Sequence, residues 1–187
     1  MKRLVMLLLL SLLVAAVPAA ASTFIHMDQQ ALVRASAAVV QGRVLSTSSY
    51  WNKTGQVIVT DALVQVEDTI FGETPSVVIV HTFGGTVGGF TVEAEGFPKF
   101  QANERLLLFL EPEREGASRV AGYLEGMYRI VRDASGIEKA VPAAITGGGF
   151  IVDKQGRQVA APKTLPLETL KSSIREDARR AGRILEN

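Results

Sequence analysis

The chain has 187 residues, among them 20 Lys and Arg, 19 Asp and Glu and no cysteine, and its formal net charge is +1. A nearly neutral chain lacks the basic footprint of a nucleic-acid-binding protein. The absence of cysteine excludes disulfides, thiolate metal sites, thiol nucleophiles and thiol redox motifs.

The first 21 residues have the three-part layout of a secretory signal peptide. Two basic residues follow Met1, residues 4–17 form an apolar run that only Ser11 interrupts, and Pro18 is followed by three alanines. Cleavage is predicted before Ser22. The apolar run is shorter than the roughly 20 residues of a membrane-spanning helix, with a retained anchor as the alternative. We therefore expect an exported protein, periplasmic or extracellular, with no membrane span once the signal peptide (1–21) is removed.

The mature chain opens with a short helix and then changes to the period of a strand. Asp28 suits the N-cap of a helix that we expect to close the end of a barrel. Residues 38–45 alternate as a strand, in which Gly42 fits a bend or a close backbone approach. Residues 46–55 are polar and predict a turn region.

Residues 56–71 give the clearest strand pattern of the chain. The apolar side chains expected on one face are Ile58, Ala62, Val64, Val66 and Ile70, and the polar ones on the other are Asp61, Gln65, Glu67 and Thr69. A strand of this length usually bends and serves both halves of a small barrel.

Further strands follow up to residue 152. They are predicted at residues 76–83, 90–94, 104–110, 119–124, 127–132, 138–141 and 150–152. The apolar run at 104–110 indicates burial on both faces of its strand. The glycines between 84 and 89 predict a flexible loop. They do not predict a phosphate-binding loop, which would need a Lys-Ser or Lys-Thr pair and a following helix. Turns at 133–136 and 154–156 suggest hairpins.

The chain ends with a loop or hairpin connection at 142–165 and a helix at 166–187. The apolar stripe of this helix is Leu167, Leu170, Ile174, Ala178, Ala181 and Leu185. We expect it to pack on its own domain, with a partner-binding helix as the alternative.

Several strand segments are similar to those of netrin-like modules, the group that includes the tissue inhibitors of metalloproteinases. The similar segments are Ala38–Val44, Val64–Gly72, Val77–Val80 and Asn103–Leu110. The chain also resembles a group of uncharacterised exported bacterial proteins that share its start, its Gly84–Gly89 loop and the strand ending in Leu-Leu-Phe-Leu. The likeness implies a mainly β fold: a small OB-like barrel at 22–141 with a short N-terminal helix and a C-terminal amphipathic helix. It does not carry over inhibitor chemistry, since those inhibitors bind metal through an N-terminal cysteine.

No catalytic or metal motif can be assembled from the sequence. Only His26 and His81 are present, without further ligands at metal-binding spacing, and no Gly-x-Ser-x-Gly elbow occurs. No cofactor or metal is expected. A hydrolase whose site forms only in the fold is the alternative, with His81 and an acidic residue of strand 56–71 as candidates.

Aromatic side chains beside glycines are the best candidates for a binding site. OB-type barrels hold ligands with early loops and the adjoining strand face. The candidate residues are Tyr50, Trp51, Gly84, Gly85, Gly88, Gly89, Phe90 and Phe97. Alternatively, the phenylalanines close the ends of the barrel.

The sequence thus predicts an exported, non-enzymatic binding domain. Its expected partner is a protein, peptide or carbohydrate, and not nucleic acid. A protease inhibitor acting through its loops is a weaker alternative.

Overall fold

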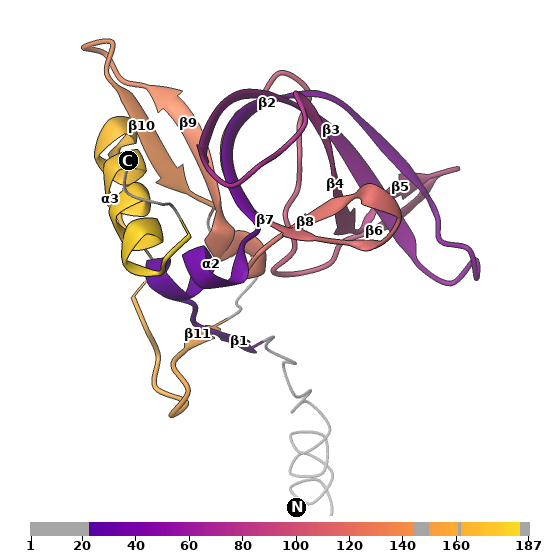
Figure 1. Cartoon of the computed structure of the whole chain (residues 1–187). Coiled ribbons are helices and arrows are strands. Elements are labelled where there is room, and N and C mark those ends of the chain that lie inside the picture. Colours follow the sequence, from indigo (N-terminus) through magenta and orange to yellow (C-terminus); the bar gives the residue numbers. More distant parts are fainter. Residues whose placement is uncertain (1–22, 144–149, 161, 184–187) are drawn as a thin grey trace, which may run out of the picture.

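The computed structural model describes residues 23–143, 150–160 and 162–183 (Figure 1). The predicted signal peptide and the cleavage site before Ser22 lie outside the described residues, as does Leu185 of the predicted helix stripe. Neither helix in the described ranges is long and apolar enough to cross a bilayer.

Strands make up nearly half of the described chain. They are β1 (Thr23–Ile25), β2 (Ala38–Trp51), β3 (Ile58–Phe71), β4 (Val77–Phe83), β5 (Gly85–Val87), β6 (Phe90–Val92), β7 (Arg105–Pro112), β8 (Ser118–Val120), β9 (Met127–Arg132), β10 (Glu138–Pro142), β11 (Phe150–Val152) and β12 (Leu165–Pro166). The helices are α2 (Gln29–Ala35) and α3 (Leu167–Arg180), with short 3-10 turns η1 (Arg114–Gly116) and η2 (Tyr123–Gly126).

Five strands close into a barrel in the order β7-β2-β3-β4-β8, with β8 returning to β7. All neighbours are antiparallel except β4 and β8, which are parallel and share the single register pair Val80 and Ser118. This closure is that of a five-stranded, partly open OB-type barrel. The predicted fold class, mainly β with an OB-like barrel and two helices, is confirmed.

Strands β9, β10 and β12 extend the sheet outward from β7, and α2 and α3 pack beside this extension (Figure 1). The protein therefore has two apolar cores that share β7. Leu106, Leu108 and Leu110 point into the barrel, whereas Leu107 and Phe109 face the helices. The predicted burial of both faces of this strand is confirmed.

The two helices belong to the second core. Asp28 caps α2 as predicted, because its Oδ1 accepts a hydrogen bond from the Ala31 amide at 2.7 Å. However, α2 packs against α3 and the outer face of β7 instead of closing the barrel. The stripe of α3 is confirmed for its buried members Leu167, Leu170, Ile174 and Ala178. The prediction is wrong for Ala181, which is exposed because α3 ends at Arg180.

Bulges explain where the predicted faces of β3 are wrong. Ile58, Ala62 and Val64 are fully buried, and Ala62 and Val64 line the barrel core as expected. Ile70 lies in the outer core instead, because the register shifts before it, between the pairs Gly42–Val66 and Gln41–Asp68, and leaves Glu67 as an extra residue. One extra residue in a strand turns the following side chain to the other face.

The close backbone approach predicted at Gly42 is confirmed. A Cβ there would lie 2.6 Å from the Gln65 carbonyl oxygen and 2.7 Å from a Val64 methyl group. Only glycine lets β2 and β3 cross at this distance, next to one of the register shifts.

Three predicted segments have different boundaries. Residues 46–51 continue strand β2 instead of forming a turn, and the real turn is 52–57, where Asn52 Oδ1 accepts the amides of residues 56 and 57 at 2.9 and 3.2 Å. The predicted strand 119–124 ends at Val120 and is followed by η2. The glycine segment 84–89 is an ordered hairpin, because β5 pairs with β6.

The N-terminal segment is fastened to the barrel by one carboxylate. Glu125, in η2, is 6% exposed. Its Oε1 lies 2.6 Å from His26 Nδ1, and its Oε2 accepts the Met27 amide at 2.8 Å. β1 also pairs in parallel with β11, which holds the start of the described chain beside residues 150–152.

Candidate functional site

Two loops and the outer face of β3 and β4 form a groove on the barrel. The loop 52–57 joins β2 to β3, and the loop 113–117 joins β7 to β8. An ion pair between Lys53 and Glu115 connects the two loops. Because β2 and β3 are the first two barrel strands and β7 and β8 the last two, this is the side on which OB-type barrels bind their ligands.

The larger part of the groove is a hollow of about 530 Å³, which we call the loop pocket. Its lining residues are Tyr50, Asn52, Lys53, Thr54, Val59, Asp61, Ile79, His81, Glu113, Glu115 and Ala117. Asp61 joins two of them, since its Oδ2 accepts a hydrogen bond from the Tyr50 hydroxyl at 2.9 Å and its Oδ1 lies 2.7 Å from His81 Nδ1.

This hydrogen-bonded group fixes the polar floor of the loop pocket. Partial burial and, after it, the hydrogen bond to Asp61 raise the pKa of Tyr50 above its ordinary value. Tyr50 therefore stays a neutral hydrogen-bond donor to the carboxylate at neutral pH. The imidazole of His81 is held through one ring nitrogen, which sets the direction of its other ring nitrogen.

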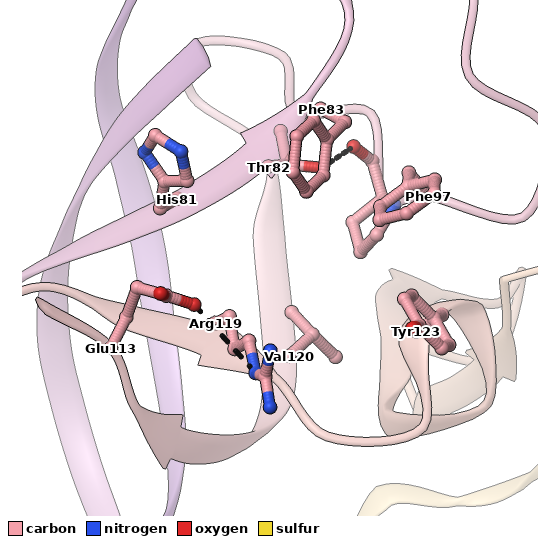
Figure 2. Close-up of a pocket in the computed structure, with 9 residues that line it drawn as sticks. His81, Thr82, Phe83, Phe97, Glu113, Arg119, Val120 and Tyr123 are labelled. Carbon is pink, nitrogen blue, oxygen red and sulfur yellow. Dashed lines mark hydrogen bonds and ion pairs between the residues drawn. The ribbon is translucent and has the colours of Figure 1, made fainter. Parts of the chain in front are cut away.

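A second, smaller hollow of about 80 Å³ adjoins the first (Figure 2), and we call it the seam pocket. It lies where β4 and β8 separate, because these strands pair only at Val80 and Ser118. Its lining residues are His81, Thr82, Phe83, Phe97, Pro98, Glu113, Arg119, Val120 and Tyr123. Since His81 and Glu113 line both hollows, the loop pocket and the seam pocket form one groove.

The apolar wall of the seam pocket is a series of rings in edge-to-face contact. Phe83 and Phe97 have their centroids 5.0 Å apart, and Phe97 and Tyr123 have theirs 4.9 Å apart. Figure 2 shows these rings along one side of the hollow and Glu113 with Arg119 along the other. Phe83 and Tyr123 each remain 46% exposed. The pocket therefore offers apolar surface to a ligand beside a charged wall.

The charged wall is more acidic than basic. Arg119 Nε lies 2.8 Å from Glu111 Oε1 and 3.7 Å from Glu113 Oε2. Asp61 and Glu115 add two carboxylates on the side of the loop pocket, where Lys53 is the cation. The carboxylates along the groove thus outnumber its lysine and arginine side chains.

The predicted site residues divide between this groove and a neighbouring hairpin. Tyr50 lines the loop pocket, and Phe97 lines the seam pocket. Trp51 points elsewhere, and its ring meets that of Phe90 edge-to-face at 6.2 Å. Gly84 and Gly85 line a third hollow of about 330 Å³ between the β5–β6 hairpin and the barrel.

Gly88 and Gly89 form the tip of that hairpin, and no neighbouring atom lies within 4 Å of where their Cβ atoms would be. Phe90 is 66% exposed. Phe100, in contrast, packs against the barrel core. Of Phe83, Phe90, Phe97 and Phe100, only Phe100 therefore fits the alternative in which phenylalanine rings close the end of the barrel.

The hairpin glycines differ in what they require. A Cβ on Gly85 would lie 2.4 Å from both Ser49 Oγ and Thr60 Oγ1, at a φ of +131°. We expect Gly85→Ala to lower the free energy of unfolding by about 1–3 kcal/mol, as overpacking does. Gly88→Asn should change it by less than about 0.5 kcal/mol, since Asn-Gly suits a turn with two positive φ angles. Urea unfolding of both variants checks this, and equal losses would contradict it.

Several groove residues were not among the sequence candidates. Tyr123 belongs to η2, where the sequence predicts a strand, and Glu113 and Arg119 reach the groove only because the barrel closes. The sequence of β4 does contain a signal for the groove, because Val77, Ile79 and Phe83 are apolar and lie on one face of the strand. That face is exposed to solvent, and the exposed fractions of the three side chains are 39%, 43% and 46%. Exposed alternation of this kind marks a contact surface.

No cluster of three or more His, Cys, Asp or Glu that could hold a metal occurs among the described residues. No protein-family model, no curated protein and no solved structure matches the chain. The groove itself therefore carries the functional argument.

Proposed function

We propose that this chain is an exported, non-enzymatic binding domain that holds its ligand in the groove formed by the loop pocket and the seam pocket. The observation that carries the proposal is the coincidence of two adjoining hollows, an exposed ring series and two facing loops on one side of an OB-type barrel. The signal-peptide pattern of residues 1–21 supports export.

Capture of a partner by the exported form tests this function. The whole chain, carrying a C-terminal tag, is expressed in a bacterium and recovered from envelope and culture fractions. N-terminal sequencing should find a chain that begins at Ser22, and an intact Met1 would contradict export. Ile79→Asp places a charge on the outer face of β4 and should reduce captured ligand at least tenfold, without a change in the unfolding midpoint.

Val131→Asp is the matched control, because Val131 is similarly exposed, at 45%, but lies on β9 away from the groove. It should capture the same partners as the wild type. Trp51→Ala separates the hairpin from the groove and should have a smaller effect than Ile79→Asp. Equal capture by the wild type and Ile79→Asp would overturn the proposed site.

The pair formed by His81 and Asp61 favours hydrolysis as a second candidate function. A carboxylate on one imidazole nitrogen orients the ring as a general base. Within the described residues, however, the hydrogen bonds of His81 reach only Asp61 and no Ser or Thr hydroxyl. Hydrolysis of chromogenic esters, peptides or glycosides that disappears in His81→Asn would establish this function. A wild-type protein inactive on all three would exclude these reactions.

A further inference from the structure

We infer that the groove takes an extended peptide segment, with one apolar side chain in the seam pocket and an adjacent basic side chain near Glu113 in the loop pocket. The inference rests on the proposed function and specifies the chemical class of its ligand.

The apolar position follows from the surface that the seam pocket leaves open. Phe83, Tyr123 and Ile79 are 46%, 46% and 43% exposed, and they surround the small hollow or its border with the loop pocket. Burial of such surface by an apolar side chain is favourable, and contiguous exposed apolar surface of this kind marks a binding site.

The backbone of Tyr123 supports a built pocket. Its φ is +56°, in the left-handed region, and it follows Gly122 at +64°. A bulky residue rarely adopts this conformation, and such strain is usually retained at ligand-binding positions. In this chain the strained backbone places the Tyr123 ring against Phe97, and this contact completes the apolar wall of the seam pocket.

The same geometry disfavours a carbohydrate. The rings meet at interplanar angles of 71° and 78°, so they turn edges and faces toward one another and form no flat platform. Two nearby polar groups are already bonded within the protein: the Thr82 hydroxyl donates to the Pro98 carbonyl at 2.9 Å, and both oxygens of Asp61 are engaged. A sugar needs such groups for its many hydroxyls, whereas an apolar side chain does not.

The basic position follows from charge. Asp61, Glu113 and Glu115 line the groove against Lys53 and Arg119, and Glu111 also binds Arg119. A lysine or arginine of a ligand is attracted to this excess of carboxylates, while the phosphates of a nucleic acid are repelled. His81 and Glu113 belong to both hollows, so the apolar and basic side chains must be close in the ligand sequence.

The extended form follows from the open edge of β4. Beyond Val80 the described part of β8 does not pair with β4, so residues 81–83 have a strand partner only in β3. A free strand edge beside side-chain pockets is the arrangement by which domains bind extended peptides.

A random peptide library displayed on phage tests the inference with the folded domain 22–187. Selection should enrich sequences that place a Phe, Leu, Ile or Met beside a Lys or Arg. A synthetic peptide of the consensus should bind Phe83→Ala at least tenfold more weakly than the wild type, and Glu113→Gln at least threefold more weakly. Ile137→Ala, 52% exposed on the β9–β10 hairpin, is the control and should bind equally well.

A glycan array probed with the same proteins separates the inference from the proposed function. Glycan binding that is lost in Phe83→Ala would overturn the peptide inference and leave the binding groove in place. A peptide consensus without a basic residue, or one insensitive to Phe83→Ala, would overturn the inference as well. No Phe83-dependent binding of either library would overturn both the inference and the proposed function. Unchanged unfolding midpoints of the variants exclude loss of fold as the cause.

Discussion

Phe109→Ala is expected to lower the free energy of unfolding by about 3–5 kcal/mol, the range for truncating a buried phenylalanine. Phe109 is the largest fully buried side chain among the described residues, and its ring packs beside that of Tyr128, with centroids 6.5 Å apart. The surrounding residues come from the sheet and both helices, so the cavity cannot close without moving several elements. For a chain of this size the melting temperature should fall by roughly 6–20 °C.

Two comparisons make this prediction specific. Leu108→Ala truncates the preceding residue, which faces the barrel core, and should lower the free energy of unfolding by about 2–5 kcal/mol. Ile137→Ala, on an exposed position, should cost less than about 0.5 kcal/mol. Because β7 belongs to both cores, both buried variants should still unfold in one transition by calorimetry. A separate early transition in Phe109→Ala would show that the helical side unfolds alone and would contradict the shared core.

The sequence was sufficient where one local pattern determines an element. The run at 104–110 is apolar at every position after Arg105, which only a strand between two cores accommodates. The cap at Asp28 and the stripe of α3 follow from local rules of the same kind. The face of Ile70 could not be predicted, because the bulge that precedes it arises from the pairing of β3 with β2, and pairing depends on another segment of the chain.

The site was predictable only in part for the same reason. Tyr50 and Phe97 could be proposed from their loops, and the pair of His81 with an acidic residue of the long strand was the enzyme alternative. Closure of the barrel places residues from β4, β8 and η2 around the seam pocket, and no local pattern contains that information. Sequence reasoning treated Tyr123 as part of a strand, since a positive φ at a non-glycine residue leaves no compositional signal.

Glu125→Ala is expected to lower the free energy of unfolding by about 3 kcal/mol and to release the segment before α2. Each hydrogen bond to a charged group contributes about 1.5–3 kcal/mol, and the two that Glu125 makes are not additive. Its carboxylate is buried and joins positions 98 and 99 residues away in the sequence. Glu125→Gln keeps an acceptor for the Met27 amide and should lose less stability than Glu125→Ala.

Hydrogen exchange distinguishes this fastening role from a general loss of stability. The amide of His26 bonds the Val152 carbonyl at 2.7 Å, and that of Met27 bonds Glu125 itself. Both should exchange at least tenfold faster in Glu125→Ala than the loss of global stability alone explains, while the exchange of β7 amides should speed up only in proportion to that loss. Glu168→Ala, with a side chain 76% exposed, should leave both unchanged.

Unchanged exchange at His26 and Met27 would contradict the prediction.

Glu125 and Tyr123 belong to the same four-residue turn, η2. Loss of the Glu125 contacts should therefore also loosen the Tyr123 ring, which closes the seam pocket. Faster exchange of the η2 amides would report this loosening directly.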